Sequence, residues 1–164
     1  MEGKEQVLLA MSGGVDSSVA AALLKKKGYL VTGLYLRLFK DDRKEKLVRR
    51  IAKIIGVPLI IKDVRREFKQ KVIDYFLSEC KSGRTPNPCV VCNREIKFKF
   101  LFREISKLKV NFIATGHYAR IKREIRNLKS EIRNKSEIKN PKFIYKLLEA
   151  KDKNKDQSYF LYTL

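Results

Sequence analysis

The sequence predicts an α/β fold in which helices are wound on both sides of a mostly parallel sheet. Short apolar runs typical of buried strands alternate along the chain with longer segments of helical periodicity. The chain has 164 residues, of which 44% are hydrophobic, which is enough for one compact core and too little for two full domains. Because strands that alternate with helices pair in parallel, we expect a doubly wound sheet whose strands all end at one edge.

Four strands and four helices are expected along the first 115 residues. The strands are expected at residues 6–11, 30–39, 58–61 and 110–115. The helices are expected at residues 17–27, 43–55, 65–81 and 93–109, and glycines at positions 28 and 56 are suited to end the first two of them. The first strand, its following turn and the first helix form one strand-turn-helix unit.

The charge of the chain points to a polyanionic partner. Lysine and arginine total 38 against 18 acidic residues, for a formal net charge of +20. Such a surface attracts nucleic acid and gains affinity by releasing its counterions, although a general coding bias toward lysine gives the same composition. No stretch is long and apolar enough to span a bilayer, and the amino terminus MEGKEQ lacks the apolar centre of a signal peptide. We therefore expect a cytoplasmic protein without a membrane partner.

A basic low-complexity segment interrupts the α/β pattern. The imperfect repeat EIRNLKS, EIRNKS, EIKN begins at Glu124, and residues 120–146 contain ten basic and three acidic residues. Charge runs of this kind are commonly solvated faces, and an RNA-binding arm is the alternative. We interpret residues 121–142 as an insertion within one domain of residues 1–164, with a helix and a hairpin both left open.

The turn after the first strand is rich in glycine and serine, with the sequence SGGVDSS at residues 12–18. In a doubly wound sheet such a turn lies at the ligand-binding edge. Glycines at positions 13 and 14 permit positive φ values and close approach, the helix that follows offers unpaired amides, and three serines offer hydroxyl donors. A capped glycine turn would need only one such polar residue. These features predict a cradle for a phosphate group.

A second polar stretch, GRTPNPCVVCNREIKF at residues 83–98, contains two of the three cysteines. An odd number of cysteines without a secretion signal argues against a disulfide framework. Pro86 and Pro88 disfavour a helix until Asn93 can cap the next one, so we expect Cys92 immediately before a helix N-terminus. The helix dipole and the neighbouring Arg84 and Arg94 would then favour the thiolate, which makes Cys92 a candidate nucleophile.

These motifs resemble those of known enzymes. The string SGGVDSS lacks the lysine of a Walker loop and the spacing of a dinucleotide-binding loop, and is similar to the pyrophosphatase-type loop (PP-loop) of adenylating enzymes with the adenine nucleotide alpha hydrolase fold. With GRTPNPCVVCNREIKF, ATGHYAR at residues 114–120 and NKDQSYFLYTL at residues 154–164, the chain resembles the tRNA-specific 2-thiouridylases of the MnmA family. The resemblance spans most of the chain, with a gap at the basic repeat.

The resemblance implies a reaction, cofactors and partners. ATP, with Mg²⁺, would adenylate the 2-carbonyl oxygen of the wobble uridine in tRNA, and sulfur delivered as a cysteine persulfide would then displace AMP. The implied partners are tRNA and a sulfur donor protein, either a cysteine desulfurase or a relay carrier.

The resemblance also implies roles for individual residues. Cys92 matches the catalytic cysteine, and Asp16 lies where a carboxylate would help hold magnesium. The nucleotide-binding positions are Ala10, Met11, Ser12, Gly13, Gly14, Val15, Asp16, Ser17, Leu36 (after the second strand) and Gly116. The positions expected to contact the substrate are Asn87, Pro88, Cys89, His117, Lys155, Asp156 and Gln157, with His117 supporting the adenylate rather than transferring a proton. Cys80 matches no catalytic position and is expected to be a structural thiol.

Two departures from the family pattern leave alternatives open. The family carries its second catalytic cysteine beyond KDQSYFL, past Leu164, so we expect this chain to be a fragment or to need a partner. Cys89 stands where other members carry aspartate, and Cys89 with Cys92 could ligate a 4Fe–4S cluster given a third cysteine from outside this chain. A tRNA- or ATP-binding remnant without catalysis and another adenylating ligase of the PP-loop type are the alternative functions.

Overall fold

The computed structural model describes residues 4–125 and 143–164, which form two compact units. The first unit comprises Met1–His117 with Thr163–Leu164, and the second comprises Tyr118–Tyr162. Each unit has its own sheet.

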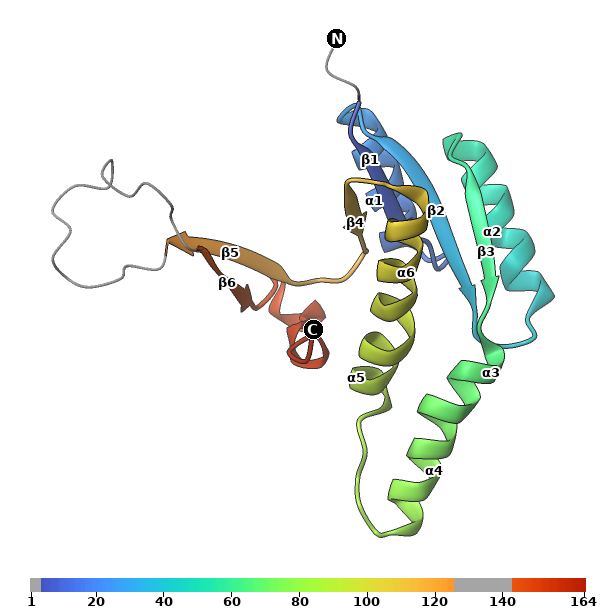
Figure 1. Ribbon diagram of the computed structural model, residues 1–164, viewed down its shortest axis with the longest axis vertical. Coiled ribbons are helices and arrows are strands. Elements are labelled where there is room, and N and C mark those ends of the chain that lie inside the picture. Colours follow the sequence, from blue (N-terminus) through green and yellow to red (C-terminus); the bar gives the residue numbers. More distant parts are fainter. Residues whose placement is uncertain (1–3, 126–142) are drawn as a thin grey trace, which may run out of the picture. The chain divides into compact units, whose positions relative to one another are not determined.

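The sheet of the first unit is parallel and has the strand order β3-β2-β1-β4 (Figure 1). Its strands are β1 (Gln6–Ala10), β2 (Leu30–Arg37), β3 (Leu59–Asp63) and β4 (Phe112–Ala114). Each strand begins and ends within two residues of its predicted bounds. The predicted doubly wound parallel sheet is confirmed.

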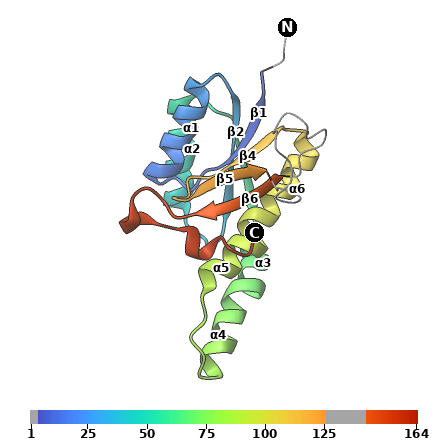
Figure 2. The same ribbon diagram turned by 90° about the vertical axis from the view of Figure 1, so that its left-hand side faces the viewer.

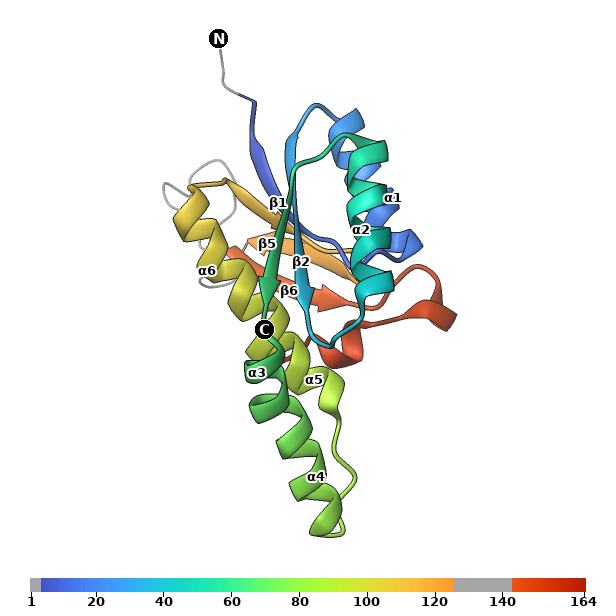
Figure 3. The ribbon, with the colours of Figure 1, turned by 90° about the vertical axis from the view of Figure 1, so that its right-hand side faces the viewer.

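Helices cover both faces of this sheet. Helices α1 (Val15–Lys26) and α2 (Asp42–Ile55) lie together on one side, and α6 (Lys99–Leu108) lies on the other (Figures 2 and 3). Alternate residues of β1 reach the two layers: Leu9 joins the cluster of α1 and α2 with Ala21 and Val48, whereas Leu8 joins Leu101 of α6. This alternation is the period of a strand that is buried on both faces.

Two of the predicted helices are interrupted by π-helical segments. The predicted helix at residues 65–81 consists of α3 (Arg65–Phe68), the π segment η1 (Lys69–Ile73) and α4 (Asp74–Lys81). The next one consists of α5 (Pro88–Cys92), the π segment η2 (Asn93–Phe98) and α6. We have no sequence signal for either π segment.

The prediction that the helix of Cys92 begins at Asn93 is wrong. The helix begins at Pro88, and the Asn87 side chain caps it by accepting hydrogen bonds from the amides of Cys89 and Val90 at 3.1 and 3.4 Å. Proline disfavours a helix interior but suits the first helical position, where its missing N–H needs no partner. The pair Asn87-Pro88 is therefore a helix-start signal and not part of a loop.

The second unit contains an antiparallel hairpin formed by β5 (Arg120–Ile125) and β6 (Phe143–Leu148). The two ends of the basic segment are thus paired strands, which favours the hairpin over the helix for these ends. Residues 126–142, most of the predicted insertion, lie outside the described residues. Two short 3₁₀ turns follow, η4 (Lys153–Lys155) and η5 (Ser158–Phe160).

Within residues 4–125 and 143–164, no helix combines the length and the apolar character that crossing a membrane requires.

Candidate active site

The candidate site lies where the strand order of the sheet reverses. From β1 the chain proceeds outward to β2 and β3, and it then returns to pair β4 with the other side of β1. Ligands of open α/β sheets bind beyond the carboxyl ends of the strands at such a switch point. The turn at residues 11–14 follows β1 there, and the segment Thr115–Gly116–His117 follows β4.

Gly13 is the residue on which the shape of this turn depends. Its φ is +79°, and a Cβ built on it would lie 2.7 Å from Cγ2 of Val48 in α2. A side chain at this position would meet both backbone strain and a steric clash. The expectation for Gly14 is wrong: its φ of −81° and ψ of 166° are open to any residue, and its Cβ would make only an ordinary contact with Ser12.

The serine hydroxyls hold the turn together. Ser17 and Ser18 each donate to the carbonyl oxygen of Gly14, at 3.1 and 2.8 Å, and Ser12 Oγ accepts from the Gly14 amide at 3.4 Å. The hydroxyl protons of Ser17 and Ser18 are thus engaged within the turn, and Ser12 Oγ lies 3.2 Å from Ser17 Oγ. Donation from these hydroxyls to an anion stays a prediction. The N-cap residue Gly14 has no side chain, so amides of the first turn of α1 add to the donors for a ligand.

The backbone of Gly116 lies against this first turn. A Cβ on Gly116 would lie 2.9 Å from the Ser17 amide nitrogen and 3.1 Å from the Asp16 carbonyl carbon. Only glycine permits this approach, so the segments after β1 and β4 meet directly. Sequence reasoning assigned both positions to one site, and the structure brings them together.

Asp16 is exposed in the first turn of α1. Among the residues that the structure describes, no three His, Cys, Asp or Glu side chains gather as metal ligands.

The other predicted nucleotide-binding residues differ in exposure. Ala10 ends β1, Met11 is buried beneath the turn and Val15 is exposed at the start of α1. Leu36 lies within β2 rather than after it, and its side chain packs against the apolar clusters of Cys92 and Leu101. The expected position of Leu36 after the strand is therefore wrong.

Cys92 is buried, with 9% of its surface exposed. It packs in a cluster with Val64, Phe68, Val72 and Ile96, between the helices that begin at Arg65 and Pro88. Burial raises the pKa of the Cys92 thiol, and nearby Lys97 partly offsets this effect. The predicted thiolate at a helix N-terminus is therefore wrong in this structure, because the N-terminal position belongs to exposed Cys89.

The arginines that were expected to activate Cys92 have other partners. Arg84 pairs with Glu79 at 2.6 Å, and Arg94 pairs with the adjacent Glu95 at 2.9 Å. Their proximity to Cys92 in sequence therefore does not become an electrostatic contribution to its pKa.

The cluster of Cys92 lies at the same edge of the sheet as the glycine turn. Leu36 and Leu38, at and just beyond the carboxyl end of β2, pack against it. Figure 1 shows α5 beyond the carboxyl ends of the strands, beside α3. The thiol and the turn are therefore not separated by the sheet.

His117 connects the segment after β4 to the helix of Cys92. Its ring stacks on Phe98 of η2 at 6.0 Å between centroids and 17° between planes, and its Nδ1 lies 2.9 Å from Thr115 Oγ1. Burial, with a smaller effect of Lys97, lowers the pKa of His117 to about 4, so the ring is neutral at pH 7. Sequence reasoning missed Phe98, although it belongs to the same motif as Cys92.

Lys155, Asp156 and Gln157 lie in the second unit and organise it internally. The Asp156 carboxylate accepts from the Ala150 amide and the Ser158 hydroxyl, both at 2.7 Å, and these hydrogen bonds lower its pKa. Gln157 exchanges hydrogen bonds with the Tyr118 backbone, and the Lys155 ammonium lies 5.4 Å from the Tyr118 ring centroid.

Comparison with known proteins identifies relatives along nearly the whole chain. A family model described as the tRNA methyl transferase HUP domain matches residues 5–164. The "tRNA-specific 2-thiouridylase MnmA 2" of Clostridium botulinum (strain Loch Maree / Type A3) is 43% identical over 165 residues, which cover 96% of this chain and 42% of that protein. The "tRNA-specific 2-thiouridylase MnmA" of Roseiflexus sp. (strain RS-1) is 44% identical, with 97% and 46% covered. The chain thus spans less than half the length of these relatives.

A solved structure shows a similar fold. It is the predicted subunit of tRNA methyltransferase from Methanocaldococcus jannaschii, with a TM-score of 0.50 and 23% identity over 81% of this chain and 60% of that one.

The two glycines of the turn are expected to differ in tolerance to alanine. Gly13→Ala introduces a strained φ and a clash with Val48 and should lower the free energy of unfolding by about 1–3 kcal/mol. Gly14→Ala is the matched control and should change it by less than about 1 kcal/mol. Denaturant unfolding measures both variants, and equal effects would contradict the described turn.

The cysteines are expected to differ in reactivity. Because Cys92 is buried and its thiol pKa is raised, iodoacetamide at pH 8 should alkylate exposed Cys80 and Cys89 first. Raising the pH should accelerate alkylation of Cys92 over a higher pH range than an ordinary thiol. Peptide mass spectrometry over time measures each rate, and modification of Cys92 as fast as Cys89 would refute the buried thiol.

Proposed function

The chain belongs to the tRNA methyl transferase HUP-domain family, and on that premise we propose that it is the ATP-binding domain of a tRNA-specific 2-thiouridylase. In the proposed reaction ATP adenylates the 2-carbonyl oxygen of the wobble uridine, and pyrophosphate leaves. The outer sulfur of a persulfide on a second cysteine then attacks the activated carbon and displaces AMP. The Cys92 thiolate breaks the remaining S–S bond, so that the sulfur stays on the base and the two cysteines form a disulfide. We propose that this reaction takes place in the cytoplasm.

One observation supports this proposal most strongly. Gly116 contacts the first turn of α1, and the adjacent His117 stacks on Phe98 of the helix that carries Cys92. These two contacts join the first turn of α1 to the cysteine helix through two adjacent residues after β4. Activation by a nucleotide and attack by sulfur need such proximity, because the activated base must be reached before water hydrolyses it.

The proposed role of the glycine turn is to bind the phosphates of ATP. The amides at the N-terminus of α1 and its dipole favour an anion, and the hydrogen bonds of Ser12, Ser17 and Ser18 hold the backbone in shape before the ligand arrives. Bound Mg²⁺ would neutralise phosphate charge, with Asp16 as its protein ligand.

The proposed role of Cys92 requires loss of its proton. Burial holds the thiol protonated near neutral pH and withholds it from solvent oxidants, and Lys97 is the neighbouring charge that favours the thiolate. Neutral His117, stacked on Phe98, positions the segment after β4 and has no proton to donate as an imidazolium at pH 7. Asn87 holds the start of α5, so that Pro88 and Cys89 are presented at the site where we propose the target base binds.

The sulfur supply involves groups outside the described site. We propose a second cysteine beyond this chain and a donor protein, a cysteine desulfurase or a relay carrier. Cys89 and Cys92 lie three residues apart on one helix and supply two thiol ligands, and no third ligand joins them within the described residues. A 4Fe–4S cluster therefore does not fit these residues alone, and we assign it no step.

Binding of ATP and tRNA without turnover is the second candidate function. The burial and raised pKa of Cys92 favour it, because a protonated thiol is a poor nucleophile. The glycine turn and the positive charge of the chain would serve binding without turnover equally well. Only a measurement of thiolation itself therefore distinguishes the two candidate functions.

Nucleoside mass spectrometry of tRNA tests the proposed function. Cells that lack the gene should lose 2-thiouridine, and restoring the gene should restore it.

Two point variants separate the proposed steps. Cys92→Ser should abolish thiolation while ATP binding persists. Asp16→Ala should weaken adenylation at least about tenfold through loss of charge-assisted binding. Thiolation by Cys80→Ser and adenylation by Asp42→Ala, a variant in the first turn of α2, should be unchanged.

Each outcome decides between the candidates. Normal 2-thiouridine in Cys92→Ser would refute the catalytic assignment. Binding of ATP and tRNA together with normal thiolation in cells that lack the gene would favour binding without turnover.

A further inference from the structure

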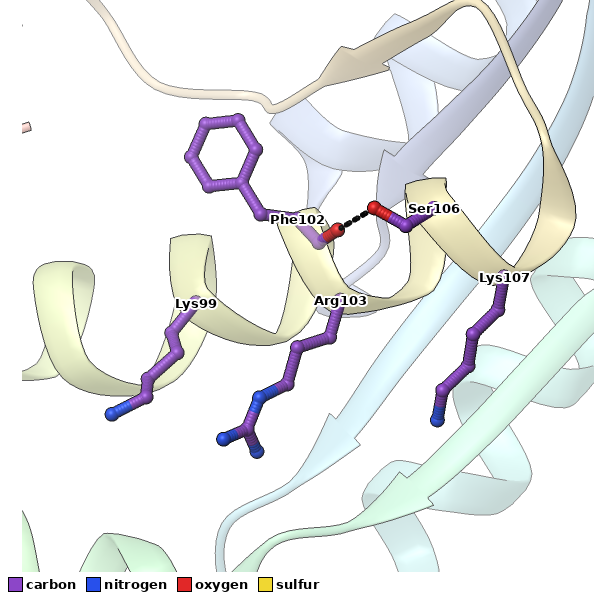
Figure 4. A pocket seen from close by; sticks show the side chains of 5 residues that line it. All are labelled: Lys99, Phe102, Arg103, Ser106 and Lys107. Carbon is purple, nitrogen blue, oxygen red and sulfur yellow. Dashed lines mark hydrogen bonds between the residues drawn. The ribbon is translucent and has the colours of Figure 1, made fainter.

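A row of cations lines a groove along α6. Lys99, Arg103 and Lys107 extend from the same side of the helix, and Phe102 points the other way (Figure 4). All four side chains are exposed, and Phe102 has 57% of its surface in solvent. Ser106, whose hydroxyl donates to the Phe102 carbonyl oxygen at 3.2 Å, completes the lining.

The spacing of these cations follows from the helix. Positions i, i+4 and i+8 lie on one face, and each step advances about 6 Å along the axis. The row therefore presents positive charge at regular intervals rather than at a single point. Such an arrangement suits a ligand with repeating negative charge.

Buried Glu104 holds a fourth cation, Lys62, beside this row. It is 5% exposed, and one of its carboxylate oxygens lies 3.5 Å from the ammonium of Lys107 and 3.4 Å from that of Lys62 in β3. One carboxylate thus holds two lysines beside each other, one from the helix and one from the edge strand of the sheet. The pair retains net positive charge.

The other charges near the row also leave an excess of cations. Lys99 shares Glu95 with Arg94, at 3.3 and 2.9 Å, and the Arg103 guanidinium lies over the Phe100 ring at 5.4 Å. Residues 93–109 contain six basic residues and two acidic ones. Both acidic residues therefore have more than one cationic partner.

We propose that this groove, whose cations are Lys99, Arg103 and Lys107 with Lys62 held beside Lys107 by Glu104, binds the ribose-phosphate backbone of tRNA. The inference deepens the proposed function and depends on it for the identity of the RNA. Phosphates are repeating anions that gain affinity with each lysine or arginine that displaces a counterion.

The position of the groove on the cysteine helix supports this assignment. Lys99 follows Cys92 by seven residues, about 10 Å along the continuous helix. A tRNA strand that lies along the row would thus pass close to the proposed reaction site. The exposed cations Lys46, Arg50 and Lys53 of α2 lie on the other face of the sheet and lack such a relation to Cys92.

Salt-dependent tRNA binding tests the groove. The triple variant Lys99→Gln, Arg103→Gln, Lys107→Gln should weaken binding of unmodified tRNA at least about tenfold near 0.1 M salt. The slope of log K against log salt should become shallower by about 2, since three phosphate contacts are lost. The matched control Lys46→Gln, Arg50→Gln, Lys53→Gln removes the same charge and should change affinity less than about threefold, with little change in slope.

Circular dichroism and thermal unfolding verify that both triple variants fold, which is expected because all six side chains are exposed. Equal loss of affinity in the two variants would mean that the whole surface attracts RNA, and would overturn the groove. Unchanged affinity in the α6 variant would also overturn it and would leave an acidic protein surface as the occupant. If the α6 variant alone loses affinity while the wild-type gene fails to restore 2-thiouridine, the groove stands and the proposed reaction fails.

Discussion

The pairing of β1 with both β2 and β4 is the constraint on which the rest of the site depends. Parallel pairing on both sides of β1 brings the carboxyl ends of three strands to one edge, although β4 follows β1 by about one hundred residues in the sequence. The backbone of Gly116 then lies against the first turn of α1. Without that pairing, the glycine turn and the segment after β4 would have no reason to meet.

From this contact the site extends by side-chain packing. His117 stacks on Phe98, Phe98 belongs to the helix of Cys92, and Cys92 packs with residues that follow β2 and β3. The polar part of the site is held by backbone geometry and serine hydrogen bonds, whereas the thiol is held in an apolar cluster. A site built in this way can bind an anion at one end and shield a thiol from water at the other. The price is a thiol whose pKa is raised by the same burial.

The sequence predicted the elements better than their ends. The strands were recognisable because β-branched and apolar runs bounded by glycine and charge have few other interpretations, and Gly56 ends α2 in the left-handed conformation as expected. The start of α5 was missed because Pro88 was treated as a helix breaker rather than a first helical residue. Partners distant in sequence, such as Val48 against Gly13 and Phe98 against His117, could not be read from local patterns. The charge partners of Arg84 and Arg94 were missed for the same reason.

Hydrogen-exchange mass spectrometry with a non-hydrolysable ATP analogue and Mg²⁺ tests the central claim most directly. If the edge between β1 and β4 binds the nucleotide, the ligand should slow exchange in two separate segments at once, residues 13–18 and residues 115–117. Exchange that slows in only one of these segments, or only elsewhere in the described part of the chain, would contradict the account.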